Sequence, residues 1–283
     1  MATAKAVIQK ENIQAKLIMV FILSLSLSGL ADLVAELVPS LEIGPIELSI
    51  STFWFVPLSL AILFNNWWVA LAAPIGEIIF SDLILGEFGG LSEFQEVALV
   101  SVALFIAGWL VRDPKNRRDL IIAGLLAYLI SELPAAFIDM LTVWIGVEEF
   151  EAVEGLPQSV FAVEMMDFIF EYIVTGVIFG LLPMLWLVPR LHGKLEPLMG
   201  LRPRSAEDRQ TADNAGRVAV YFVVGFVLAI AITLAAANGF NLVEWEPEFL
   251  DSIGEWFRWV AIGAAVVVAG LVFLLRSRDN TSK

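Results

Sequence analysis

Residues 159–190 read SVFAVEMMDFIFEYIVTGVIFGLLPMLWLVPR, and only four of these residues are charged. About 20 consecutive apolar residues suffice to cross the hydrocarbon core of a bilayer as a helix. Barrel strands are shorter and alternate in polarity, so this run favours a membrane-spanning helix. Three of its charges are acids, Glu164, Asp167 and Glu171. Their spacings of three and four residues place them on one stripe of that helix.

The whole chain has the same apolar character. Of its 283 residues, 59% are hydrophobic and 17% are charged, and the mean hydropathy is +0.81. A soluble protein of this size would need a more polar surface than this composition supplies. Backbone groups in lipid must satisfy their own hydrogen bonds, which leaves helices or a closed barrel as spanning structures. The long apolar runs therefore predict an all-α polytopic membrane protein.

Apolar runs separated by polar turns predict six helices followed by two more. The expected ranges are 14–38, 50–64, 67–86, 97–111, 119–146, 159–190, 217–239 and 256–275. The second helix is short, and Asn65 and Asn66 form a tight polar break after it. We predict a six-helix substrate-binding membrane domain over residues 1–191, a cytoplasmic linker over 192–216 and a two-helix transmembrane appendage over 217–283.

Basic and acidic residues alternate between the predicted helices, which indicates the orientation of the chain. Lys and Arg gather before the first helix, between the fourth and fifth, in the linker and at the end of the chain. The intervening loops, such as 87–96 and 147–157, contain acids and no Lys or Arg. Cytoplasmic loops carry an excess of Lys and Arg. We therefore expect a multi-pass protein of the cell membrane with both termini cytoplasmic.

The residue types exclude several kinds of site. The chain has no cysteine and a single histidine, His192, so it holds neither a thiolate site nor a histidine-rich metal site. A net charge of −14 argues against nucleic acid as a partner. No G-x-x-x-x-G-K-[ST] motif occurs, so any ATP would be hydrolysed by another chain. We expect no cofactor, no resident metal and no enzymatic activity.

Acids interrupt four of the first six predicted spans, the first, third, fifth and sixth, whereas Lys, Arg and His are absent from the middles of all six. Besides the three acids in 159–190, these are Asp32, Glu36, Glu77, Asp82, Glu132 and Asp139. A charged side chain at the bilayer centre costs about 2.5–3.5 kcal/mol on insertion scales. A bound cation, a proton or water would reduce that cost. With the predicted orientation, all of these acids lie at mid-membrane or in the outer half, which favours an acidic cavity that opens outward.

These acids predict a binding site for a small cationic or amine-bearing molecule. Trp144 joins the site because an aromatic face attracts organic cations, although Trp near helix ends also anchors helices at the interface. Solvation at the outer interface is an alternative explanation for Asp32, Glu36, Asp139 and Glu164. The predicted substrate-binding residues are Glu77, Asp82, Glu132, Asp139, Trp144, Glu164, Asp167 and Glu171.

Residues 53–90, FWFVPLSLAILFNNWWVALAAPIGEIIFSDLILGEFGG, resemble the corresponding part of substrate-binding S components of energy-coupling factor (ECF) transporters. The resemblance covers residues 1 to about 191. It implies a six-helix bundle with both termini inside, which binds a vitamin or related micronutrient from outside. It also implies a ligand site in the outer half of the bundle. The implied partners are a transmembrane coupling subunit and two cytoplasmic ATPase subunits.

Two features depart from the S-component pattern. Members of that family often meet the coupling subunit through small residues near the cytoplasmic end of the first helix. The candidates here are Ser24 with Ser28 and Ala31 with Ala35, and both pairs lie further outward. The two additional helices after the linker are a second departure.

Two other functions remain open. A stand-alone secondary transporter or channel could use the acids as a relay for protons or for hard divalent cations. The inner half of the predicted bundle is poor in acids, which argues against a continuous path. An intramembrane enzyme could use a carboxylate pair such as Asp139 and Asp167, but no hydrolase motif surrounds them.

Overall fold

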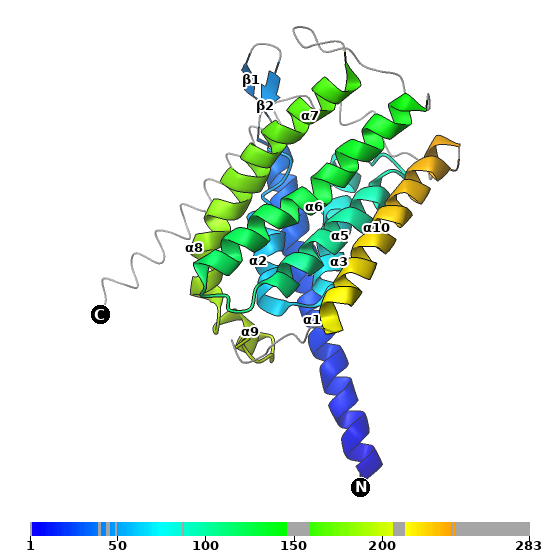
Figure 1. Cartoon of the computed structure of the whole chain (residues 1–283). Coiled ribbons are helices and arrows are strands. Elements are labelled where there is room, and N and C mark those ends of the chain that lie inside the picture. The colour runs from blue at the N-terminus through cyan, green and yellow to red at the C-terminus, as the bar shows by residue number, and fades with distance from the viewer. Residues whose placement is uncertain are drawn as a thin grey trace.

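The computed structural model describes residues 2–38, 41–43, 46–48, 50–86, 88–145, 159–205, 213–238 and 240. They form a helical bundle with a short two-stranded hairpin at one end (Figure 1). We call this the hairpin end, and the opposite end, where α9 lies, the α9 end. The elements are α1 (Ala2–Glu36), β1 (Leu41–Ile43), β2 (Ile46–Leu48), α2 (Phe55–Phe64), α3 (Trp67–Glu77), η1 (Ile78–Asp82), α4 (Leu83–Leu85), α5 (Glu93–Leu110), α6 (Arg117–Trp144), α7 (Val160–Glu171), η2 (Tyr172–Leu181), α8 (Leu182–Leu191), α9 (Leu195–Leu198) and α10 (Asp213–Ala237).

Six helices in the described part of the chain are long and apolar enough to cross a membrane. They cover 14–36, 67–85, 93–110, 117–144, 160–191 and 218–236. The prediction of a helical fold compatible with a multi-pass membrane protein is thereby confirmed. The predicted helix 256–275 lies outside the described residues. Between the first two predicted helices lies the antiparallel hairpin β1–β2.

The fourth predicted helix begins four residues earlier than expected. α5 starts at Glu93, so Glu93 and Glu96 lie in its first turn and not in a loop. Acidic side chains are favourable there because they interact with the positive end of the helix dipole. This correction moves two carboxylates from a predicted outer loop into the bundle.

The second helix is short, as predicted, but it begins at Phe55 and not at residue 50. α2 has ten residues, about 15 Å at 1.5 Å per residue, and every residue from Pro57 to Phe64 is buried. Asn65 ends α2 in the left-handed conformation, with a φ of 43°. The side chain of Asn66 then accepts a hydrogen bond from the backbone N–H of Trp68 at 2.8 Å, which caps α3. Residues 51–53, before α2, are not helical. Non-helical backbone is tolerated at membrane depth where it is buried in protein or lines a cavity.

Two glycines allow α1 and α3 to cross at very short range. A Cβ atom on Gly29 would lie 2.1 Å from the backbone oxygen of Gly76. A Cβ atom on Gly76 would lie 2.1 Å from the backbone oxygen of Leu25. Across the same pair of helices, Oγ of Ser24 donates a hydrogen bond to the carbonyl of Val69 at 2.7 Å. Small residues commonly mediate such close approach between membrane helices.

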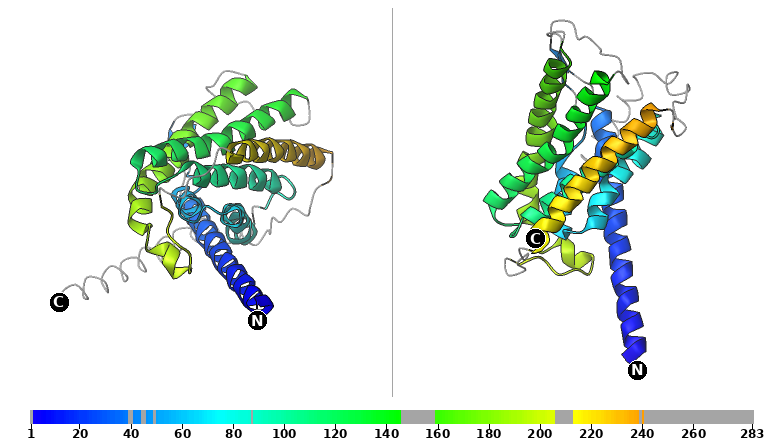
Figure 2. Two further views of the ribbon diagram at one scale, coloured as in Figure 1. Left: turned by 60° about the horizontal axis from the view of Figure 1, so that its bottom comes forward. Right: turned by 45° about the vertical axis from the view of Figure 1, so that its right-hand side comes forward.

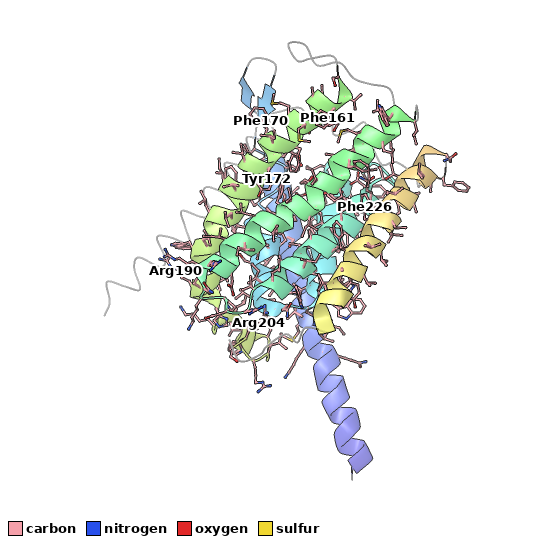
Figure 3. The ribbon with its side chains drawn as sticks, in the orientation of Figure 1. Phe161, Phe170, Tyr172, Arg190, Arg204 and Phe226 are labelled. Carbon is pink, nitrogen blue, oxygen red and sulfur yellow. The ribbon has the colours of Figure 1, made fainter. Side chains whose placement is uncertain are left out.

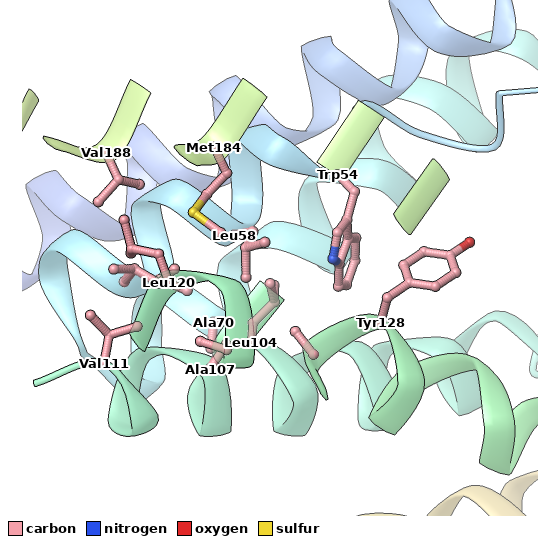
Figure 4. Close-up of a cluster of buried hydrophobic side chains, with 14 of the residues drawn as sticks. Trp54, Leu58, Ala70, Leu104, Ala107, Val111, Leu120, Tyr128, Met184 and Val188 are labelled. Carbon is pink, nitrogen blue, oxygen red and sulfur yellow. The ribbon is translucent and has the colours of Figure 1, made fainter. Parts of the chain in front are cut away.

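Buried apolar side chains fill the half of the bundle toward the α9 end (Figure 4). The cluster includes Leu58 of α2, Leu104 of α5 and Leu120 of α6, together with Met184 and Val188 of α8. Each of these five side chains is fully buried. Interiors of this kind are close-packed, with few voids large enough for water. This half of the bundle is therefore an apolar core.

The start of the predicted linker is folded against the bundle. Glu196 is buried and accepts a hydrogen bond from the backbone N–H of Gly193 at 2.8 Å. Its other carboxylate oxygen lies 2.7 Å from Nδ1 of His192. Leu201 packs against a small buried cluster that contains Val20 of α1. Residues 192–205 thus cover the α9 end of the bundle.

Arg204 ties this segment to the ends of two helices (Figure 3). Its guanidinium group donates hydrogen bonds to the carbonyl of Ile62 at 3.0 Å and to that of Gly108 at 2.8 Å. It donates a third to the carbonyl of Val111 at 2.5 Å. These carbonyls lie at the C-terminal ends of α2 and α5, where backbone oxygens lack partners within the helix.

We expect Arg204→Ala to lower the free energy of unfolding by about 2–4 kcal/mol, because hydrogen bonds to a charged group are individually worth about 1.5–3 kcal/mol. The measurement is the apparent melting temperature of the purified protein in detergent. Arg202→Ala is the matched control, since Arg202 is exposed. Superimposable melting curves for the two variants would contradict this structural role.

α10, the first helix of the predicted appendage, lies along α5 (Figure 2). The ring of Tyr221 stacks on Trp67 with a centroid distance of 5.7 Å and meets Phe105 edge-on at 5.4 Å. A Cβ atom added to Gly225 of α10 would lie 2.7 Å from a methyl group of Val102 on α5. α10 therefore forms part of the bundle wall beside α5.

Candidate functional site

A cavity of about 670 Å³ lies in the hairpin-end half of the bundle. Its lining comes from the end of α1, the second half of α3 with η1, the start of α5, the second half of α6, the end of α7 and the end of α10. Ser51 and Thr52, in the extended segment before α2, contribute as well. Small-molecule sites typically have volumes of about 300–1,000 Å³. The cavity is thus large enough for an organic ligand.

Nine carboxylates line this cavity, and no Lys, Arg or His is among the described residues that line it. Carboxylates within low-dielectric walls favour the binding of cations. The nine are Asp32, Glu36, Glu77, Asp82, Glu93, Glu96, Glu132, Asp139 and Glu171.

Glu77 is the acid whose environment is most informative. Only 8% of the residue is exposed. Its Oε1 atom is buried and has no hydrogen-bond partner among the described residues. A buried carboxylate oxygen without a partner is costly. A cation bound in the cavity beside Glu77 would offset that cost.

Glu77 and Glu171 occupy equivalent positions in their helices. Each is the last residue of a regular α-helix, and each directly precedes a π-helical segment, η1 or η2. Such segments are rare and occur frequently at functional sites. Pro74 lies three residues before Glu77 and lacks a backbone N–H, which favours a local departure from α-helical bonding. Both helices thus depart from α-helical geometry where a carboxylate lines the cavity.

Hydrogen bonds join the wall that carries Glu171 to neighbouring segments. Oγ of Ser51 donates to Oε1 of Glu171 at 2.7 Å, and the backbone N–H of Ser51 donates to Oγ1 of Thr175 at 3.3 Å. The hydroxyl of Tyr172, labelled in Figure 3, donates to the carbonyl of Leu125 on α6 at 3.1 Å. The carboxylate of Glu171 is therefore oriented by the chain itself.

Two aromatic rings separate the cavity from the apolar core. Trp54 and Tyr128 line the cavity and also belong to the core cluster (Figure 4). Each is 2% exposed, and their ring centroids lie 5.5 Å apart in an edge-to-face arrangement. The indole Nε1–H of Trp54 has no hydrogen-bond partner among the described residues. Rings at this position can attract a cation and pack against its apolar part.

Residues 19–283 match the model of a family of unknown function, DUF8171. The chain belongs to this family. Neither the comparison with curated proteins nor the comparison with solved structures gave a match. The region matched by DUF8171 contains every residue that lines the cavity, including Thr233 and Ala236 of α10. The cavity is therefore a feature of the part of the chain that defines membership of the family.

The structure brings five of the predicted site residues of this DUF8171 protein to the cavity. These are Glu77, Asp82, Glu132, Asp139 and Glu171. Trp144, Glu164 and Asp167 are not among the lining residues, and Trp144 is 88% exposed at the end of α6. Glu164 and Asp167 share a stripe with Glu171. They lie about 10 Å and about 6 Å further along α7, where the cavity has ended.

Four further acids line the cavity that were not predicted as site residues. These are Asp32, Glu36, Glu93 and Glu96. For Asp32 and Glu36, solvation at the outer interface was the alternative explanation, and Glu93 and Glu96 were assigned to a loop. Ser92 directly before Glu93, with a second acid at Glu96, is typical of a helix N-terminus and could have revealed the correct start of α5.

The carboxylates are distributed over the walls of the cavity. Within the described ranges, no group of three or more acidic or histidine side chains converges closely enough to hold a metal ion. Asp139 lines the cavity and Asp167 does not, so the structure does not bring this pair together there. On α10, the hydroxyl of Thr233 is hydrogen-bonded to the side chain of Gln95, which joins two lining residues at the wall.

Proposed function

We propose that this DUF8171 protein is the substrate-binding subunit of a membrane uptake transporter and that its cavity binds a small organic cation. The observation that carries the proposal is a cavity with nine carboxylates and no basic residue among its described lining. A cation is the ligand whose charge complements this lining.

A purely structural role accounts poorly for the same residues. Structural acids in this chain have protein partners, as Glu196 has in His192 and Gly193. Glu77 is also buried, yet one of its oxygens has no such partner among the described residues. Intramembrane acids that carry an insertion cost commonly mark substrate or ion pathways.

The transport direction and the partners are part of the proposal. The basic loops favour cytoplasmic termini in the cell membrane, which would make the hairpin end the outer end and the cavity accessible from outside. The chain contains no P-loop motif, so we assign energy coupling to a transmembrane coupling subunit and two ATPase subunits, as the resemblance to ECF S components implies. Ser24 and Ser28 are fully buried, so contact with a coupling subunit would use another surface.

A stand-alone channel or secondary transporter is the less favoured function. It would need a polar path from the cavity to the α9 end. Fully buried apolar side chains, among them Leu58, Leu104 and Met184, occupy that half of the bundle. The described part of the chain therefore supports binding at one side more strongly than conduction through the middle.

The proposal predicts that the protein retains its ligand during gentle purification. Extraction and mass spectrometry should reveal one amine-bearing molecule per chain. The double variant Glu77→Gln/Glu132→Gln, purified in parallel, should release much less of it because both carboxylates line the cavity. An empty wild-type protein that by itself moves protons or metal ions across liposome membranes would overturn the proposal.

A further inference from the structure

We infer that the ligand is a linear aliphatic polyamine, a chain with several ammonium groups, and this inference rests on the proposed binding of an organic cation. The observation behind it is the arrangement of five carboxylates on five helices, each of which packs against the next. We call Asp32, Glu77, Glu96, Glu132 and Glu171 the carboxylate row; all five line the cavity.

The order of the row follows from the packing of the helices. α1 contacts α3, α3 contacts α5, α5 contacts α6, and α6 contacts α7. Each of these five helices contributes one member of the row. The row is therefore spread over five neighbouring helices of the cavity wall.

Electrostatic neighbours follow the same order. The charged group that acts most strongly on Glu77 is Asp32, followed by Glu96. The strongest charged neighbour of Glu96 is Glu132, and that of Glu132 is Glu171. Members of the row thus influence one another from helix to helix, while no three of the described acids converge at one point.

A row spread over five helices favours a ligand with separated positive charges. A metal ion would need several oxygens at one point, and within the described residues no such group of three occurs. A single ammonium group would meet only part of the row. Each ammonium of a polyamine donates up to three hydrogen bonds and can therefore contact carboxylates from neighbouring helices.

Apolar side chains beside the row suit the methylene segments of such a ligand. Trp54, Pro74, Ile78 and Val100 line the same cavity, as does Tyr128. Long cationic chains bury their methylene groups on apolar surface while the charged groups reach polar partners. The buried Oε1 of Glu77 and the indole N–H of Trp54 lack partners among the described residues, which marks this side of the cavity as a ligand position.

The test is calorimetric titration of the purified full chain with butylamine, 1,4-diaminobutane, spermidine and spermine at constant ionic strength. Tetraethylammonium and Mg²⁺ serve as a single organic charge and a compact divalent charge. We expect affinity to increase at least tenfold from the monoamine to the diamine and again to spermine, with one ligand per chain. Equal affinity for butylamine or tetraethylammonium and spermine would overturn the polyamine inference while leaving organic-cation binding intact.

Variants show whether the row is responsible. Glu77→Gln/Glu171→Gln removes one charge near each end and should weaken spermine binding at least 100-fold, with a much smaller effect on butylamine. Glu164→Gln is the matched control, because Glu164 lies on α7 with Glu171 but outside the cavity. Melting curves establish that each variant is folded. If the folded double variant binds spermine with unchanged affinity, spermine binds to acids outside the carboxylate row and the inference is wrong. If none of the amines or tetraethylammonium binds, the proposed function itself is wrong.

Discussion

Gly29→Ala is expected to be among the most destabilising single substitutions in this protein. The added Cβ would lie 2.1 Å from the backbone oxygen of Gly76 and 2.9 Å from Cβ of Phe80. Backbone atoms of a packed helix cannot rotate away, so α1 and α3 would have to separate. Overpacking typically costs about 1–3 kcal/mol, and we expect a loss of about 3 kcal/mol or more here.

A glycine elsewhere in the bundle provides the control. At Gly216 of α10 an added Cβ meets no atom within 4 Å. Alanine has the higher helix propensity by about 1 kcal/mol, so Gly216→Ala should be neutral or slightly stabilising. The measurement compares apparent melting temperatures in detergent and the yield of monodisperse protein. Similar values for Gly29→Ala and Gly216→Ala would show that the α1–α3 contact does not govern stability.

Glu77→Gln is expected to change ligand binding and stability in opposite directions. Loss of one partner of a buried charge pair costs about 2–5 kcal/mol, which corresponds to at least about 30-fold weaker binding of the cationic ligand. The ligand-free variant should be about 1–2 kcal/mol more stable, because a neutral amide is cheaper to bury than a carboxylate. This combination is typical of a residue retained for function at the expense of stability.

A structural acid should behave differently. Glu196 is 1% exposed, and its carboxylate has protein partners at the α9 end, away from the cavity. Glu196→Gln weakens the contact with His192 and should therefore lower stability without affecting ligand affinity. Thermal melts without ligand and titrations with ligand separate the two cases. If Glu77→Gln lowers stability and leaves affinity unchanged, Glu77 is a structural residue and the cavity binds its ligand elsewhere.

Much of the candidate site could be predicted because acids within apolar runs are conspicuous. Glu77, Asp82, Glu132, Asp139 and Glu171 were all identified from their cost in lipid, and all line the cavity. The spacing along a helix also grouped acids on a common stripe. It could not show where the cavity ends along that stripe, which is why Glu164 and Asp167 were included.

Other members of the lining depend on contacts that a sequence pattern does not contain. Asp32 reaches the cavity because α1 crosses α3 at Gly29 and Gly76, a contact set by two small residues far apart in the chain. Thr233 does so because α10 packs along α5. Helix pairing of this kind depends on the fit of two complete surfaces, so one helix alone does not reveal it.

The sequence by itself determined that the protein is helical and suited to a membrane, because long apolar runs must satisfy their backbone within each helix. It also determined that the middles of the first six predicted spans contain acids and no Lys, Arg or His, since the order of residue types alone establishes this. Only the tertiary structure decided which acids share one cavity and in what order they line it. Depth, rotation and crossing point of each helix depend on packing between distant segments, and these quantities place one carboxylate in the cavity and its neighbour outside.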